Sequence, residues 1–315
     1  MRFVFRADAS NNIGSGHVMR SSAIAEEVIN RGIDAIFVGK ISNLPWVSAR
    51  IKSLGFLEIL ECPADFAADA SRDILIIDSY EIPLEDEFIQ PANWHKVINI
   101  FDELTPDYSC DLGIHPGLTN AWPKKSWNLT LSGSKYVPLR KSIGKSSRKT
   151  PGGPLKVLVV GGGSDAFGFV PAVAKVLSEL PNNFQVTLFG NISIGKNYDQ
   201  RFVVSEVGPG LDLVSNSIDL VFTTASTTSL EFLARGAAVA IGCAVNNQSL
   251  YYKELSDGKY AAPIGEFLSN MWHLDAEMVR KLINSEELRS TLQENSAKLI
   301  DLDGAKRIVD EILKL

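Results

Sequence analysis

Short runs of apolar residues, each followed by a polar stretch, recur through the first hundred residues of the chain. The runs are four or five residues long, which is typical of strands buried on both faces of a parallel sheet. We predict strands at residues 2–5, 35–38, 74–77 and 97–101. Residues 18–31, between the first two strands, show a helical pattern that Gly32 ends. This alternation predicts an α/β domain with a parallel sheet.

The same alternation starts again after residue 155. Apolar runs predict strands at residues 156–160, 186–189, 201–204, 220–223 and 238–241. Helical patterns follow at residues 169–180 and 228–235, and polar helices fill residues 275–315. Two separate runs of strand and helix predict two doubly wound, Rossmann-like domains.

Residues 139–154 separate the two runs and are basic and rich in small residues, glycine and proline. Such a composition cannot build a core and is typical of a linker. We assign residues 1–145 to an N-terminal domain, 146–154 to the linker and 155–315 to a C-terminal domain. Because ligands bind at the carboxyl ends of the strands in such sheets, we expect the two domains to face a shared cleft.

The composition narrows the class of partner. Apolar residues make up 45% of the chain, charged residues make up 22%, and the net charge is −6. This net negative charge argues against a nucleic acid or an anionic membrane as the partner. No apolar run is long enough to span a bilayer, and three scattered cysteines are typical of a reducing cytoplasm. We therefore expect a cytoplasmic protein whose partner is a small molecule.

The loop after the first predicted strand carries a candidate for catalysis. Gly14 and Gly16 precede His17, which opens the following helix. Glycines let the backbone approach a ligand, and the N–H groups of a helix start bind phosphate. Met19 stands where a dinucleotide-binding motif has its third glycine, which argues against a nicotinamide cofactor. His17 can move a proton near neutral pH, although a lone histidine is more often a capping or core residue.

Acidic residues follow two further strands of the first half. Asp78 and Tyr80 come after residues 74–77, and Asp102 with Glu103 follows the next strand. The carboxyl ends of parallel strands share one edge of a sheet, so these groups should converge near His17. Acids at strand ends can also be simple turn formers. The remaining histidines show no spacing typical of ligands, so we predict no metal and no cofactor.

In the second half, hydroxyl groups cluster at the start of a predicted helix. Thr227, Thr228 and Ser229 suit phosphate oxygens, and Glu231 can accept hydrogen bonds from two neighbouring hydroxyls of a ribose. The other interpretation is an N-cap run with a carboxylate that matches the helix dipole. The amides of Asn247 and Gln248 suit a sugar, but they could equally form a turn.

These motifs, in this order, resemble the UDP-sugar hydrolase of pseudaminic acid biosynthesis and relatives from spore-coat polysaccharide synthesis. Those proteins are similar to GT-B glycosyltransferases of the peptidoglycan N-acetylglucosaminyltransferase type. The matching segments are Arg6-Ala7-Asp8, Ile13-Gly14-Ser15-Gly16-His17-Val18-Met19-Arg20, Asp78-Ser79-Tyr80, Phe101-Asp102-Glu103, Gly133-Ser134-Lys135-Tyr136, Val159-Val160-Gly161-Gly162-Gly163-Ser164-Asp165, Thr227-Thr228-Ser229-Leu230-Glu231 and Asn247-Gln248.

The resemblance implies a role for each matching position. His17 would be catalytic, with Tyr80 and Asp78 close to the reaction. The C-terminal domain would hold UDP, with Glu231 on the ribose, the hydroxyl run on the phosphates and the Asn-Gln pair on the sugar. Further contacts with substrate or nucleotide are expected from Asp8, Gly14, Gly16, Arg20, Gly162, Gly163, Ser164 and Asp165. The sequence departs from the family at Ala225-Ser226, where glycines are usual, and at Asp102-Glu103, where the family has two aspartates.

We therefore expect hydrolysis of a nucleotide-activated sugar, UDP-linked and acetamido-substituted, in the biosynthesis of a surface glycan or a nonulosonic acid. Water would attack the anomeric carbon while His17 accepts its proton. One alternative is a GT-B glycosyltransferase, in which His17 deprotonates an acceptor hydroxyl. A second alternative is a relative that binds nucleotide sugars without turnover, which the missing glycines motivate.

Overall fold

The computed structural model describes residues 1–119, 129–142, 153–163, 165–181, 183–190, 198–205, 211 and 217–315. The chain forms two compact units. Unit 1 consists of Met1–Lys141 together with Asp301–Leu315, and unit 2 consists of Ser142–Ile300. Each unit has its own sheet and its own hydrophobic core.

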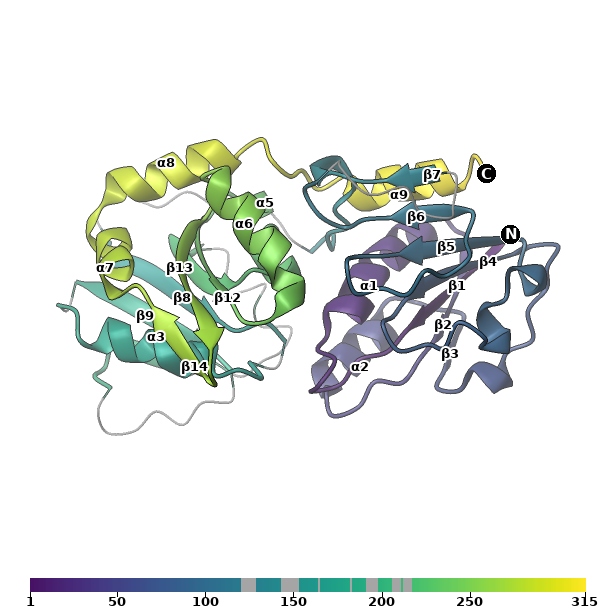
Figure 1. The fold of residues 1–315 in the computed structure, drawn as a ribbon, viewed down its shortest axis with the longest axis horizontal. Coiled ribbons are helices and arrows are strands. Elements are labelled where there is room, and N and C mark those ends of the chain that lie inside the picture. The colour runs from purple at the N-terminus through teal and green to yellow at the C-terminus, as the bar shows by residue number, and fades with distance from the viewer. Residues whose placement is uncertain are drawn as a thin grey trace. The chain divides into compact units, whose positions relative to one another are not determined.

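Unit 1 is built on a parallel sheet with the strand order β3-β2-β1-β4-β5-β6-β7 (Figure 1). Its strands are β1 (Arg2–Ala7), β2 (Asp34–Val38), β3 (Glu58–Leu60), β4 (Asp73–Asp78), β5 (Lys96–Ile100), β6 (Leu112–Ile114) and β7 (Leu129–Leu131). Its helices are α1 (Gly16–Asn30), α2 (Pro45–Ser53) and α9 (Gly304–Ile312), with short 3-10 turns at Pro63–Asp65, Glu87–Ile89, Pro91–Asn93 and Ser134–Tyr136. The order of strands reverses between β1 and β4, and such a switch point is where open α/β sheets bind ligands.

Unit 2 repeats this topology with the strand order β10-β9-β8-β11-β12-β13-β14. Its strands are β8 (Leu155–Val160), β9 (Phe184–Phe189), β10 (Phe202–Ser205), β11 (Leu220–Thr224), β12 (Ala238–Cys243), β13 (Ala262–Leu268) and β14 (Met271–Leu274). Its helices are α3 (Phe169–Ser178), α5 (Thr227–Arg235), α6 (Ser249–Asp257), α7 (Ala276–Asn284) and α8 (Glu286–Ser296), with a 3-10 turn at Asn246–Gln248. The switch point lies between β8 and β11.

The predicted Rossmann-like α/β class is confirmed in both units, and every predicted strand exists with ends that shift by a few residues. The strands that the pattern missed are the three-residue β3, β6 and β7 and the antiparallel hairpin of β13 and β14. The three-residue strands are too short to show a period. The hairpin turns at Ser269 and Asn270, which both have positive φ, as a two-residue type I′ turn requires.

The C-terminal helix differs from the sequence prediction. We placed residues 155–315 in the C-terminal domain, but residues 301–315 belong to unit 1. Ile308, Val309 and Ile312 of α9 are buried in the same core as Val18 and Ile24 of α1. Figure 1 shows α9, in yellow, among the elements of unit 1. The spacing of apolar residues shows that this helix has one buried face, but it cannot show which core receives it. Most of the predicted linker lies outside the described residues.

Helix α9 should therefore contribute to the stability of unit 1. Ile308 is fully buried, so Ile308→Ala should lower the free energy of unfolding by roughly 2–5 kcal/mol in urea denaturation. Leu313→Ala, at a site that is 38% exposed, should change it by about 0.5 kcal/mol or less. Hydrogen exchange should become faster in α1 but not in α3. Faster exchange confined to α3 would contradict the assignment.

Candidate functional site

The switch point of unit 1 places His17 beside the end of β4. Strand β1 pairs with β4 up to Ala7 and Asp78, and the chain then turns through residues 8–15 into α1. Gly14 has φ +83, and its N–H donates to the Ser10 carbonyl over 2.7 Å. A Cβ built on Gly16 meets no described atom within 4 Å. Packing within the described chain therefore does not require glycine at position 16, and the backbone there is open to a ligand.

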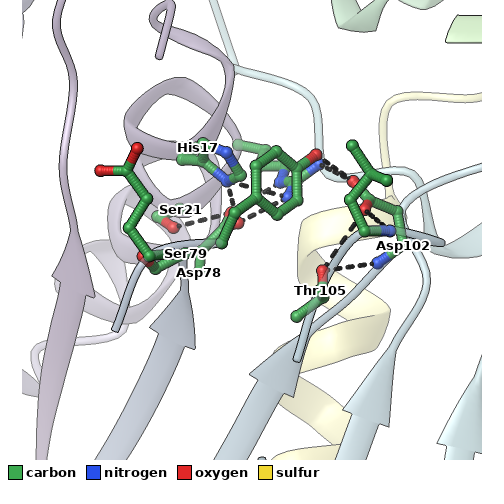
Figure 2. A network of polar contacts seen from close by, with 10 residues as sticks. His17, Ser21, Asp78, Ser79, Asp102 and Thr105 are labelled. Atoms are coloured by element: carbon green, nitrogen blue, oxygen red, sulfur yellow. Dashed lines mark hydrogen bonds and ion pairs between the residues drawn. The ribbon is translucent and has the colours of Figure 1, made fainter. Parts of the chain in front are cut away.

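The carboxylate of Asp78 is the centre of a buried polar network (Figure 2). It is fully buried at the end of β4. The Nε and Nη2 atoms of Arg20 donate to its two oxygens over 2.6 and 2.5 Å, and His17 Nδ1 lies 2.5 Å from Oδ1. Ser21 Oγ donates to Oδ2 over 3.3 Å. Both sides of this carboxylate are therefore held by groups of the first turns of α1.

This geometry selects the tautomer of His17. An ionised carboxylate only accepts hydrogen bonds, so the proton of the neutral imidazole belongs on Nδ1. The Nη2 atom of Arg20 lies 3.1 Å from Nδ1 because both nitrogens donate to the same Asp78 oxygen. The lone pair of His17 is then on Nε2, which can accept a proton. A buried carboxylate that orients an imidazole in this way is a common arrangement for a general base.

The charges around Asp78 keep its carboxylate ionised. Burial alone would raise the pKa of Asp78, but the positive charge of Arg20 and the contact with His17 outweigh it and lower that pKa below its usual value. Burial alone would lower the pKa of Arg20, but the facing Asp78 carboxylate raises that pKa well above its usual value. The two groups form a buried ion pair in which both partners remain charged.

A second carboxylate, on the neighbouring strand end, joins the network. The hydroxyl of Tyr80 donates a short hydrogen bond to Asp102 Oδ2, and Arg20 Nη1 lies 3.7 Å from that oxygen. The ring of Tyr80 meets that of His17 edge to face, with 4.3 Å between centroids. These contacts connect five residues in a ring, which we call the strand-end cluster: His17, Asp78, Arg20, Asp102 and Tyr80. The structure brings Asp78 and Asp102 together near His17, as predicted, whereas Glu103 is exposed.

Two predicted ligand contacts of unit 1 have other partners in the structure. The carboxylate of Asp8 accepts from the Lys40 N–H and pairs with Arg6, each over 2.7 Å, and so ties β1 to the segment after β2. Arg20 is buried, and its guanidinium contacts Asp78 and Asp102. We therefore assign Arg20 to the interior of the cluster.

His115 lies at the end of β6 and was not among the predicted site residues. It is almost fully buried, and its ring packs on that of Phe101 with 5.7 Å between centroids. Burial, aided by the positive charge of Arg20, lowers the pKa of His115 to about 3. The imidazole is therefore neutral at physiological pH. Its position in the sequence, directly after a short strand that the pattern missed, gave no signal.

In unit 2, the glycine loop after β8 is closed by Asp165. A Cβ on Gly161 would lie 1.9 Å from Asp165 Oδ1, so the close approach requires glycine there. The Asp165 carboxylate accepts from the Phe169 N–H over 2.9 Å and the Val170 N–H over 3.1 Å, and so caps α3. Burial raises the pKa of Asp165 to about 6, although these N–H groups oppose the rise. The start of α3 is thus already occupied by a side chain.

The other predicted residues of this loop are Gly162, Gly163 and Ser164. Gly162 has φ +87, and a Cβ built there meets no described atom within 4 Å. Gly163 follows it in the same half-buried turn. Ser164 lies outside the described residues.

The start of α5 is different, because its N-cap residue, Ser226, makes no capping bond through its side chain. Thr227 and Thr228 are half-buried in the first turn. Ser229 is fully buried, and its hydroxyl donates to the Ser226 carbonyl over 2.7 Å. Glu231 is buried one turn further along the helix. Neither Ala225 nor Ser226 has a positive φ, so the residues that replace the expected glycines fit this turn without strain.

The amides of Asn247 and Gln248 lie in the 3-10 turn after β12, at the same edge of the sheet. Gln248 Oε1 accepts from the Ala244 N–H over 2.9 Å, which fixes the turn. Among the residues that the structure describes, no group of three histidine, cysteine or acidic side chains could hold a metal ion. None of the described helices is long and apolar enough to cross a membrane.

Comparison with known proteins supports the motif resemblance. The chain is 26% identical over 129 residues to UDP-2,4-diacetamido-2,4,6-trideoxy-beta-L-altropyranose hydrolase of Campylobacter jejuni subsp. jejuni. The match spans 40% of this chain and 44% of that relative, so less than half of the relative's length is covered. No family model matches the sequence.

Solved structures of the GT-B type share the fold over the whole chain. MurG of Acinetobacter baumannii aligns with TM-score 0.61 and 12% identity, covering 100% of both chains. Arabidopsis thaliana UGT89C1, complexed with UDP, aligns with TM-score 0.67 and 12% identity over 99% of both chains. A UDP-N-acetylglucosamine 2-epimerase aligns with TM-score 0.61 and 12% identity over 99% of this chain and 96% of that one. At these identities the likeness shows a two-domain Rossmann-like fold, and the partial match shows similarity to a UDP-sugar hydrolase.

The buried His115 should make stability depend on pH. The pKa of His115 is 6.5 in its ordinary state and about 3 in the folded chain, so only the unfolded chain binds this proton between those values. The stability that depends on the neutral His115 is fully present above about pH 6.5, and the free energy of unfolding falls as the pH drops toward 3. In urea denaturation, the free energy of unfolding of His115→Gln should fall less steeply with decreasing pH, by up to about 1.4 kcal/mol per pH unit. The exposed His95→Gln is the control, and equal slopes for all three proteins would contradict the burial of a neutral imidazole.

Proposed function

We propose that this protein hydrolyses a nucleotide-activated sugar, with UDP as the nucleotide and His17 as the general base. The observation that carries the proposal is the contact of His17 Nδ1 with the buried Asp78 carboxylate at 2.5 Å. It lies at the switch point of unit 1, where open α/β sheets bind ligands. The dyad of Asp78 and His17 is buried and hydrogen-bonded, which argues against a protein that has only kept the fold.

The strand-end cluster suits the uptake of a proton. Two carboxylates face one guanidinium, so one negative charge is uncompensated while His17 is neutral. In the proposed step, an O–H bond of water breaks and its proton moves to His17 Nε2. The water oxygen bonds to the anomeric carbon, and the bond from that carbon to the phosphate oxygen breaks, with its electron pair leaving on the phosphate. The imidazolium that forms is stabilised by Asp78.

The nucleotide is assigned to the start of α5 in unit 2. The N–H groups and hydroxyls of Thr227 and Thr228 offer donors to a diphosphate, whereas the Ser229 N–H already donates to the Ser226 carbonyl over 2.9 Å. The start of α3 already holds the Asp165 carboxylate, which would repel phosphate. The buried Glu231 can accept from the two ribose hydroxyls, and Asn247 and Gln248 are assigned to the sugar. Support comes from the similar hydrolase, whose name states a UDP-linked diacetamido sugar, and from the UDP complex of UGT89C1.

A glycosyltransferase is the second candidate, because solved structures named as a forosaminyltransferase and as the glycosyltransferase SnogD share the fold. In that case His17 would take the proton of an acceptor hydroxyl instead of water. Incubation with a panel of nucleotide sugars separates the two functions. UDP and free sugar formed without an acceptor indicate the hydrolase, whereas UDP release that requires an acceptor indicates the transferase.

The role of His17 is tested by His17→Asn, which keeps a hydrogen-bonding side chain but cannot take the proton. Turnover should fall by roughly 10²- to 10⁴-fold, as expected for a general base. The affinity for UDP, measured by calorimetry, should change little. The exposed His95→Asn in the same unit is the control and should keep full activity. Near-normal turnover of His17→Asn would show that His17 only positions the substrate.

The role of Glu231 is tested by Glu231→Gln, which keeps the size of the side chain and removes its charge. UDP affinity in calorimetry should fall roughly 5- to 150-fold, the worth of hydrogen bonds to a buried charged group. The exposed Glu277→Gln on α7, in the same unit, should bind UDP like the unmodified protein. If Glu231→Gln and Glu277→Gln bind UDP equally well, Glu231 does not contact the ribose.

A further inference from the structure

We infer that Asp102 is a positioning residue that makes Tyr80 a hydrogen-bond acceptor toward the reacting water, as Asp78 does for His17. The inference rests on the proposed function and deepens it, because it concerns the same site. Asp102 is the second residue after β5 and belongs to the strand-end cluster.

The two carboxylate oxygens of Asp102 have separate tasks. Oδ1 accepts from the Leu104 N–H over 3.0 Å and from Thr105 Oγ1 over 3.3 Å, which fixes the turn after β5. Oδ2 accepts from the Tyr80 hydroxyl and faces Arg20 (Figure 2). The turn after β5 uses only Oδ1. The second oxygen is directed at the side chain that packs on His17.

The bond to Asp102 determines what Tyr80 can offer a ligand. A phenol has one proton, and this proton is donated to Asp102. Toward a ligand, the Tyr80 oxygen can then only accept. His17 is in the same state, because its one proton on the neutral ring faces Asp78 and Nε2 carries a lone pair.

Two such acceptors suit one water molecule. Water has two protons, and when both are held by acceptors its lone pairs are directed elsewhere, toward an electrophile. Only His17 takes a proton in the step proposed above, whereas Tyr80 holds the other O–H bond and remains unchanged. Arg20 contacts both carboxylates, so a single buried cation links the two groups that orient the rings.

Asp102→Asn tests this arrangement with almost no change of shape. The amide oxygen can keep the turn bonds, but the amide N–H₂ would donate to Tyr80, and the phenol would turn its own proton toward the ligand. We expect kcat to fall on the order of 10- to 100-fold while KM stays within about 3-fold, because the lost interaction acts on the reacting water. The double variant Tyr80→Phe/Asp102→Asn should be no slower than Tyr80→Phe, because Asp102 acts through Tyr80.

Matched controls separate positioning from folding. Asp111→Asn changes another carboxylate of unit 1, which accepts from the Val97 N–H over 2.8 Å. Tyr108→Phe removes another phenol, which donates to the Ile82 carbonyl over 2.9 Å. Both controls lie outside the cluster, so kcat and KM should be unchanged even where stability falls.

A spectroscopic readout does not depend on turnover. In the full-length protein labelled with 13C at tyrosine Cζ, the Tyr80 resonance is assigned by its loss in Tyr80→Phe. It should move in Asp102→Asn, whereas the Tyr108 resonance stays in place. An unmoved Tyr80 resonance, or rate losses that multiply in the double variant, would overturn the inference. If the unmodified protein hydrolyses no nucleotide sugar, the proposed function fails, and the Tyr80 resonance alone decides on the role of Asp102.

Discussion

The site in unit 1 depends on one buried carboxylate. Asp78 is fully buried at the end of a central strand, and a charge in that place is costly unless it is paired and hydrogen-bonded. Arg20, His17 and Ser21 from the first turns of α1 supply the partners. Loss of any one of them would leave part of the charge without compensation. The same interactions therefore fix the start of α1 on the sheet and orient the imidazole.

Helix α1 is held at its other end as well. Its apolar face packs on α9, and Arg31, next to its last residue, pairs with Asp310 over 2.7 Å and with Glu27 over 2.8 Å. The helix that carries the proposed base is thus fixed by a buried ion pair near its N-terminus and by packing near its C-terminus. This explains why the last fifteen residues of the chain belong to unit 1, although the sequence runs into them directly from unit 2.

The two units share one strand order but carry different side chains at their switch points. In unit 1 the residues at the switch point are titratable and buried, which suits proton transfer. In unit 2 the start of α3 is capped by Asp165, whereas the start of α5 has no capping bond from its N-cap side chain. A helix start with available N–H groups suits an anion. The difference comes from the side chains in the loops, since the strands are arranged alike.

The sequence by itself determined the strand and helix pattern, both glycine loops, and the candidate site residues His17, Asp78 and Tyr80. These features follow from the spacing of apolar residues and from the positions of glycines, which are local properties of the chain. It also indicated that Asp102 lies at the same sheet edge. Only the tertiary structure decided that Arg20 is an interior residue and that Asp165 caps a helix, because both facts depend on which carboxylate or N–H group each side chain reaches. The burial of His115 and the place of α9 were likewise decided by packing between segments far apart in the chain. Spacing along a sequence shows which residues share a face, whereas the partner of that face depends on the fold as a whole.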